Sequence, residues 1–254
     1  MIKSFENEKI LSKSLALEIL RKLKNKKKFV LGCPGGRSLK KTYYYLGRLS
    51  HTHNISLNNL IIVMMDEYVF KKSNKFYLVN SNSHYSCVKF SYNVIKKLLN
   101  YKKNEDNALK KGNILFPTPT KPENYDRKIK SIGGIDIFLL ASGSSDGHVA
   151  FNNAYSKINQ KTHITKLSIS TRKDNIKTFP KFKKIDEVPK YGLTVGLKTI
   201  SSLSKNAILV LTGKEKSIAF KNISSLKDYD NSWPASIIYK CKNNKIYVDK
   251  KVKL

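Results

Sequence analysis

Short continuous apolar segments, separated by stretches with helical periodicity, restrict the fold of this chain more than any other feature. They predict strands at residues 29–32, 60–65, 135–141, 163–170, 192–195, 207–211, 236–240 and 245–249, and helices at 10–24, 40–49, 84–99, 197–204 and 214–224. Uninterrupted apolar strands that are linked through helices are typical of a parallel sheet buried on both faces. We therefore expect an α/β fold with a mostly parallel sheet and helices on both faces.

The domain organisation follows from the length of the chain. Its 254 residues fit one such fold, and we expect a single domain over residues 1–254 without internal repeats. The lysine-rich stretches 101–111 and 172–185 are expected to be solvated loops rather than linkers.

Several classes of protein are excluded by the sequence. No apolar run reaches the roughly 18–20 residues that a membrane span needs, and the N-terminal segment lacks the apolar core of a signal peptide. Cys33, Cys87 and Cys241 lie far apart without metal-site spacing, which fits a reducing compartment. We expect a cytoplasmic protein with neither a membrane partner nor a metal.

The net charge of +31 raises the question of a nucleic-acid partner. Of the 49 Lys and Arg residues only five are arginine, and the lysines are spread along the whole chain. Nucleic-acid recognition usually recruits arginine for its bidentate geometry, so this pattern favours codon bias over a designed groove. We expect no specific nucleic-acid partner, although salt-sensitive adsorption to polyanions should remain.

Candidate site residues follow strands of the predicted sheet, where α/β proteins bind their ligands. The turn CPGGRS (33–38) places Gly35 and Gly36 for close backbone approach and adds Arg37 and Ser38 before a helix. The pattern suits a phosphate, although ordinary tight turns also contain glycine pairs, and the spacing is not that of a Walker loop. Lys216, in TGKEK after the strand 207–211, can reach an anion at the same edge.

Two other turns carry titratable groups. Asp66 follows the strand 60–65 and can act as a general base in a desolvated crevice, or merely cap the next segment. Asp146 and His148 lie one residue apart in SGSSDGH, where the carboxylate can set the tautomer of the imidazole.

Together, the stretches FVLGCPGGRSLKKTY, IIVMMDEYV, IDIFLLASGSSDGHVAFN, VPKYGLTVGLKTI and ILVLTGKEKSIAF resemble the glucosamine-6-phosphate deaminase and 6-phosphogluconolactonase superfamily. They occur in the family's order over most of residues 28–224, and DNSWPAS (230–236) is a weaker match. MDEYV with DGHVAFN and VPKYGLTVG points to the deaminase branch. The resemblance implies a modified Rossmann-like α/β fold, a small sugar phosphate as substrate and no cofactor.

The resemblance also implies roles for single residues. The residues that match the family's phosphate-binding positions are Gly35, Gly36, Arg37, Ser38, Lys216 and Lys177. Lys177 stands where the deaminases use an arginine, so the charge is kept and the bidentate geometry is lost. Asp66 matches the base that moves a proton between C2 and C1. His148 matches the group that opens the sugar ring, and Asp146 is the carboxylate beside it.

The sequence departs from the family at one site position. The deaminases have a glutamate after AFN that completes a relay with the histidine, and this chain has Asn153. An amide neither takes nor releases a proton at neutral pH, so this relay position leaves the exact substrate open.

We expect a hexose-phosphate aldose–ketose isomerase or deaminase, most simply one that converts glucosamine 6-phosphate to fructose 6-phosphate and ammonia. A lactonase acting through His148 and a non-catalytic sugar-phosphate sensor are the alternatives, and a nucleic-acid module rests on charge alone. A lactonase needs no base at C2, so Asp66 separates these readings. Assembly into a homo-oligomer is left open.

Overall fold

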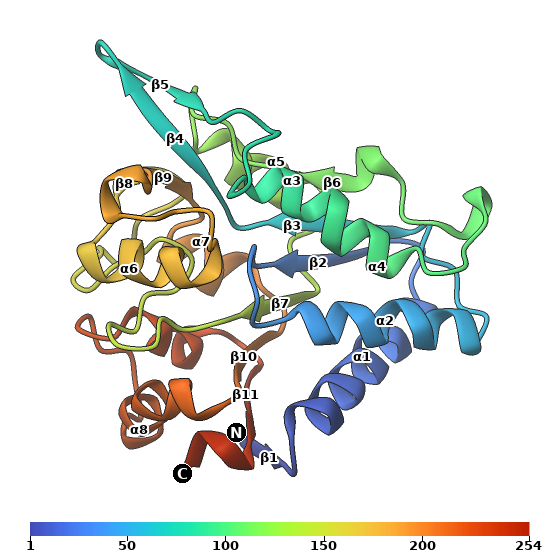
Figure 1. Cartoon of the computed structure of the whole chain (residues 1–254). Helices are drawn as coiled ribbons and strands as arrows, with labels where there is room; N and C mark the ends of the chain where they lie inside the picture. Colours follow the sequence, from blue (N-terminus) through green and yellow to red (C-terminus); the bar gives the residue numbers. More distant parts are fainter. Residues whose placement is uncertain (254) are drawn as a thin grey trace.

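The central feature of the computed structural model, which describes residues 1–253, is a sheet of seven strands in the order β1-β11-β10-β7-β2-β3-β6 (Figure 1). Every pair of neighbours in it is parallel. The strands are β1 (Ile2–Phe5), β2 (Phe29–Cys33), β3 (Leu60–Met64), β6 (Ile114–Leu115), β7 (Ile137–Leu140), β10 (Ala207–Leu211) and β11 (Asn244–Asp249). The predicted α/β fold with a mostly parallel sheet is therefore confirmed.

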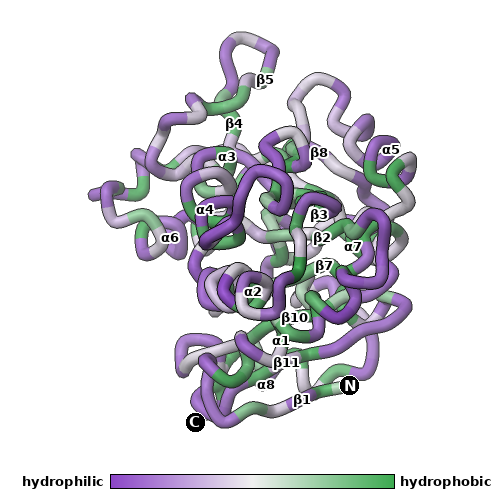
Figure 2. The backbone as a smooth tube through the Cα atoms, turned by 90° about the vertical axis from the view of Figure 1, so that its right-hand side faces the viewer, coloured by the Kyte–Doolittle hydropathy of each residue, from purple (hydrophilic) through white to green (hydrophobic). Residues whose placement is uncertain are grey.

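Helices cover both faces of this sheet because successive strand side chains point to opposite sides. In β2, Val30 packs into one hydrophobic cluster and Leu31 into the other. The helices packed on the Leu31 face are α1 (Glu8–Lys24), α2 (Lys40–Thr52), α3 (Cys87–Phe90) and α4 (Lys97–Leu99). Those on the Val30 face are α5 (Asn124–Ser131), α7 (Leu197–Leu203) and α8 (Ser217–Ser225). Figure 2 shows the hydrophobic segments gathered at the central strands.

A second, antiparallel sheet of four strands was not predicted from the sequence. Its order is β5-β4-β9-β8, with β4 (Asp66–Lys72), β5 (Lys75–Leu78), β8 (His163–Lys166) and β9 (Tyr191–Thr194). The β4–β5 hairpin projects from the body of the molecule in Figure 1. Because β3 ends at Met64 and β4 begins at Asp66, the chain passes from one sheet to the other across a single residue, Met65.

Three expected elements differ in the structure. The end of the 163–170 strand and the start of the 172–185 loop form helix α6 (Ile169–Thr178), whose cap Ser168 accepts a hydrogen bond from Thr171 N–H. The apolar run 236–240 lies in a 3₁₀ helix, Pro234–Lys240, because the proline fixes φ at the first turn. Helix 84–99 contains a π-helical segment, Ser91–Lys96, between α3 and α4.

None of the helices within residues 1–253 combines the length and the apolarity that crossing a bilayer demands.

One buried carboxylate ties the amino ends of the central strands together. Asp136, just before β7, is 4 % exposed and accepts hydrogen bonds from Val30 N–H (2.8 Å), Lys26 Nζ (2.6 Å) and Lys205 Nζ (3.0 Å). Burial alone would raise the pKa of Asp136, but these hydrogen bonds and the lysine charge hold it below its ordinary value. This end of the sheet therefore supports stability rather than chemistry.

We expect Asp136→Asn to lower the free energy of unfolding at pH 7 by about 1–3 kcal/mol, because two lysines lose their charged acceptor. A carboxyl whose pKa is lowered by folding stabilises the protein above its unfolded pKa and loses that effect as the pH falls through the folded pKa. The difference between the two proteins should therefore shrink below about pH 4 in denaturant titrations. Asp228→Asn, which removes the same charge from an exposed pair with Lys240, is the control and should leave stability unchanged. An equal effect of both variants would contradict this account.

Candidate active site

A cleft of about 980 Å³ opens at the carboxyl ends of the central strands. It is lined by the turns after β2, β7 and β10, by the start of β4 and by α6. The predicted site residues that line it are Gly35, Gly36, Arg37, Ser38, Asp66, His148, Lys177 and Lys216. Asp146 and Asn153 stand behind His148, to which Asp146 is hydrogen bonded directly and Asn153 through Thr171. The structure thus brings together residues that are far apart in the sequence.

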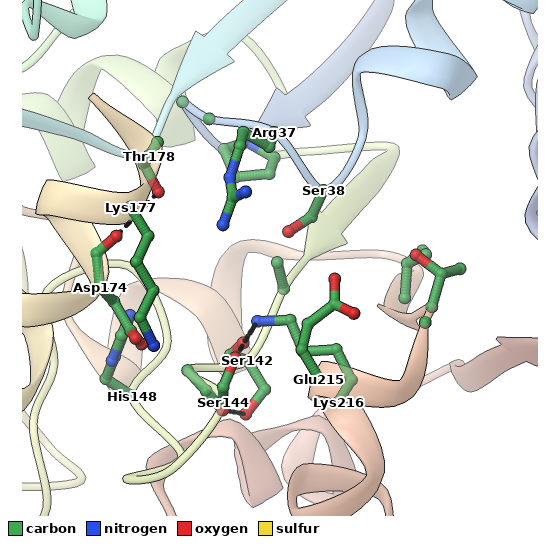
Figure 3. A pocket seen from close by; sticks show the side chains of 18 of the residues that line it. Arg37, Ser38, Ser142, Ser144, His148, Asp174, Lys177, Thr178, Glu215 and Lys216 are labelled. Atoms are coloured by element: carbon green, nitrogen blue, oxygen red, sulfur yellow. Dashed lines mark hydrogen bonds between the residues drawn. The ribbon is translucent and has the colours of Figure 1, made fainter. Parts of the chain in front are cut away.

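Three of the cationic side chains that line the cleft come from three different elements. Figure 3 shows Arg37 after β2, Lys177 on α6 and Lys216 before α8 around the same space. Lys216 Nζ donates to the Ser142 carbonyl (2.7 Å) and to Ser144 Oγ (3.0 Å), which fixes its ammonium group at the wall. Burial lowers the pKa of Lys216.

The loop before α2 adds further donors for an anion. No side chain caps the first turn of α2 after Leu39, so the N–H groups at this helix start have no side-chain partner. Gly36, at φ +131°, adopts a backbone conformation that side chains rarely allow. With the three cations nearby, this end of the cleft is suited to a phosphate group.

Asp66 is the most perturbed acid in the cleft. Its side chain belongs to a residue that is 5 % exposed, and burial raises its pKa to about 7. The neighbouring Glu67 carboxylate also raises it, while the Cys87 thiol and the charge of His148 act in the opposite direction. A carboxyl with this pKa can exchange a proton at neutral pH.

Asp146 and His148 form a short hydrogen bond. His148 Nδ1 lies 2.7 Å from Asp146 Oδ1, and the His148 N–H also reaches that oxygen at 3.2 Å. Burial alone would raise the pKa of Asp146, but the hydrogen bond and charge of His148 lower it to about 2. The ionised carboxylate therefore favours a proton on Nδ1, which leaves Nε2 of the ring for a ligand.

Two hydroxyl groups that the sequence analysis missed complete this network. Thr171 Oγ1 lies 3.3 Å from His148 Nδ1 and donates to Asn153 Oδ1 at 3.2 Å. Ser168 Oγ donates to Thr171 Oγ1 at 2.9 Å and lies 3.4 Å from Asp146 Oδ2. The missed signal is the spacing of Ser168 and Thr171, which caps α6 where the end of a strand was expected.

The cleft offers nothing that resembles a metal centre in the described part of the chain. Within residues 1–253, no three His, Cys, Asp or Glu side chains are grouped so that they could hold a metal ion.

The scan against family models identifies the family. The model described as glucosamine-6-phosphate isomerases/6-phosphogluconolactonase matches residues 6–248. The chain belongs to this family. Among similar proteins, the glucosamine-6-phosphate deaminase of Oceanobacillus iheyensis is 30 % identical over 246 residues, covering 96 % of this chain and 92 % of the relative. The glucosamine-6-phosphate deaminase of Dictyostelium discoideum is 34 % identical over 234 residues, covering 90 % and 80 %.

Two solved structures share the fold of this chain. A monomeric glucosamine-6-phosphate deaminase aligns with a TM-score of 0.84 at 26 % identity and covers 99 % of this chain and 98 % of its own. The 6-phosphogluconolactonase of Thermotoga maritima aligns with a TM-score of 0.66 at 19 % identity, covering 98 % of both chains. At that identity the second likeness concerns the fold alone.

Gly143 packs directly against the hydrogen-bonded pair of Asp146 and His148. A Cβ added there would lie 2.3 Å from both Asp146 Oδ1 and His148 Nδ1, far inside van der Waals contact. Any side chain at this position must therefore push the two groups apart or displace the loop.

We expect Gly143→Ala to lower catalytic turnover at least about tenfold, because a small displacement of catalytic groups is costly. The protein should still fold, since the site lies in a loop beyond β7. The turnover number tests the site, and circular dichroism of the same samples tests whether the variant is folded. Gly112→Ala is the control, because a Cβ there meets nothing within 4 Å. Full activity of Gly143→Ala would contradict the assigned geometry.

Proposed function

We propose that this protein is a hexose-phosphate isomerase/deaminase that converts glucosamine 6-phosphate and water to fructose 6-phosphate and ammonia. The observation that carries the proposal is a buried carboxyl, Asp66, in a cleft shared with His148 and with the cations Arg37, Lys177 and Lys216, where burial raises the pKa of the acid. The names of the relatives from Oceanobacillus iheyensis and Dictyostelium discoideum support the same reaction.

The phosphate of the substrate would bind at the cationic end of the cleft. Arg37, Lys177 and Lys216 supply positive charge, and the loop of Gly35, Gly36 and Ser38 supplies donors close to the backbone. The binding energy of the phosphate is then available to hold the reacting carbons of the sugar in the correct orientation.

His148 would open the sugar ring. Its Nε2 takes the proton of the anomeric hydroxyl and passes it to the ring oxygen as the bond between C1 and that oxygen breaks, which yields the open-chain aldehyde and leaves the imidazole neutral again. Asp146 keeps the other ring nitrogen protonated and stabilises the positive charge that forms on the imidazole.

Asp66 would carry the isomerisation. It removes the proton from C2 and gives an enolamine, then returns the proton to C1 and gives an imine at C2. Water adds to this imine, and ammonia leaves to produce fructose 6-phosphate. General acid–base steps of this kind contribute about 10²–10⁴-fold each.

Asn153 would position its neighbours through hydrogen bonds and would not itself transfer a proton. Its Nδ2 donates to the Lys166 carbonyl at 3.0 Å, and its Oδ1 accepts from Thr171, which in turn lies against His148. The amide therefore holds Thr171 beside the histidine, and proton transfer during ring opening falls to the His148–Asp146 pair alone.

The proposal also concerns the cell compartment and the assembly state of the enzyme. The three cysteines are free, in keeping with a reducing and cytoplasmic compartment. The structurally similar deaminase is monomeric, which supports a site formed within a single chain.

We expect Asp66→Asn to lower kcat for ammonia and fructose 6-phosphate release at least about 10²-fold, because an amide cannot accept the C2 proton. The KM for glucosamine 6-phosphate should change little, since the phosphate groups are untouched. Coupled assays of both products, with wild-type protein alongside, make the measurement.

Other outcomes would point to the alternatives. Hydrolysis of 6-phosphogluconolactone that survives Asp66→Asn would support a lactonase, which needs no base at C2. Binding of glucosamine 6-phosphate that raises the Tm of the wild type without turnover of either substrate would support a sensor. Either result would contradict the proposed deamination.

A further inference from the structure

A cysteine thiol lies directly against the proposed base. Cys87 Sγ is 3.3 Å from Asp66 Oδ1, and Cys87 is 4 % exposed at the inner wall of the cleft. This distance is within hydrogen-bond range for sulfur, and because an ionised carboxylate can only accept, the thiol is the donor to the charged form of Asp66. The other two cysteines make different contacts. Cys33 Sγ faces the Leu31 carbonyl, and Cys241 Sγ faces the carbonyls of Ile200 and Ile237.

The backbone around Cys87 is fixed by the residue next to the base. Glu67 is 1 % exposed and accepts hydrogen bonds from Cys87 N–H (3.0 Å), Val88 N–H (2.8 Å) and Ser86 Oγ (2.8 Å). Both adjacent acids of β4 thus contact Cys87 at the start of α3. Glu67 accepts from its backbone N–H, and Asp66 accepts from its thiol. The three hydrogen bonds to Glu67 therefore fix the backbone at Cys87, and the contact with Asp66 orients the thiol.

The phosphate loop closes the other side of the thiol. A Cβ added to Gly35 would lie 3.1 Å from Cys87 Sγ and 3.6 Å from Asp66 Oδ1. The glycine thus lets the loop pack on both groups, and the sulfur has carboxylate on one side and backbone on the other.

The thiol stays protonated in this position. Burial raises the pKa of Cys87 well above its ordinary value, and the neighbouring carboxylates Asp66 and Glu67 raise it further. Cys87 is therefore a donor over the whole neutral pH range and not a nucleophile.

We propose that Cys87 is a positioning residue for the base, its thiol donating a hydrogen bond to the Asp66 carboxylate and so favouring the ionised, proton-accepting form. The inference rests on the proposed function, because it concerns the same proton transfer. A donor to the charged form of an acid lowers its pKa, so Cys87 opposes the effect of burial on Asp66. The other titratable groups near enough to interact electrostatically with Asp66 are Glu67 and Tyr68 on β4, Tyr43 on α2, Tyr125 on α5 and His148 after β7.

The pH dependence of kcat/KM for glucosamine 6-phosphate tests the inference. Cys87→Ala should move the acid limb of the profile upward by about 0.5–1 pH unit, because Asp66 loses a donor to its charged form. Above the limb, turnover should return to within a few-fold of the wild type. Cys87→Ser keeps a hydroxyl donor and should leave the limb near its wild-type position. Cys241→Ala is the matched control, a buried thiol remote from Asp66, and should not move it.

A limb that is unmoved in Cys87→Ala, or moved equally in the serine and alanine variants, would overturn the inference. A second measurement separates its failure from failure of the proposed function. In protein labelled with ¹³C at the aspartate carboxyls, the resonance absent from Asp66→Asn identifies Asp66, and its titration requires no substrate. An upward shift in Cys87→Ala supports the hydrogen bond even when no turnover is found. An unchanged titration in an enzyme that deaminates normally sinks the inference and leaves the function standing.

Discussion

A carboxylate removed from water must be solvated by the protein, and the two neighbouring acids of β4 meet this demand in opposite ways. Glu67 is surrounded by N–H and O–H donors and anchors the start of α3. Asp66 receives only a weak thiol donor among the side chains and backbone groups of the described chain, and its pKa rises to about 7. The rest of the site depends on this contrast, because it turns an ordinary acid into a group that exchanges protons at neutral pH.

The sheet topology explains why this acid faces the cleft. Strands β10, β7, β2 and β3 are consecutive neighbours and all run parallel, so the chain segments that follow them emerge at one edge. There, Lys216, His148 and Arg37 meet Asp66, although they are separated by long stretches of sequence. Since β4 starts at once in a second sheet, Asp66 is held by a regular backbone register opposite Thr194 and does not lie in a free loop.

The parts of the fold that could be predicted are those with a strong local signal. The apolar runs at β2, β3, β7 and β10 and the glycine turn after β2 specify strands and a sharp loop by themselves. The β4–β5 hairpin gives a weak signal, because its turn holds Ser73 at φ 51° without a glycine. The segment 236–240 has strand composition, and only Pro234 indicates its 3₁₀ geometry.

The site was predictable where one residue type carries the chemistry. Asp66, His148 and the glycine loop could be proposed from the sequence because each follows a predicted strand, and the family resemblance suggested a role for each. Thr171 and Cys87 could not, because their importance lies in distances to His148 and Asp66 across the fold. Neither a threonine nor a cysteine indicates by itself which group it will meet. Tertiary packing alone supplies that information.

The central claim is that Asp66 moves a proton between C2 and C1 of the sugar. The most direct measurement is the reaction of unlabelled glucosamine 6-phosphate in D₂O, with the fructose 6-phosphate examined by NMR. Because one base carries the proton, deuterium that enters by exchange of the Asp66 carboxyl with solvent should appear at C1 on one face only, at most one per molecule, and Asp66→Asn should form no labelled product. Fructose 6-phosphate that carries deuterium equally on both faces of C1, or labelled product from Asp66→Asn, would contradict the account.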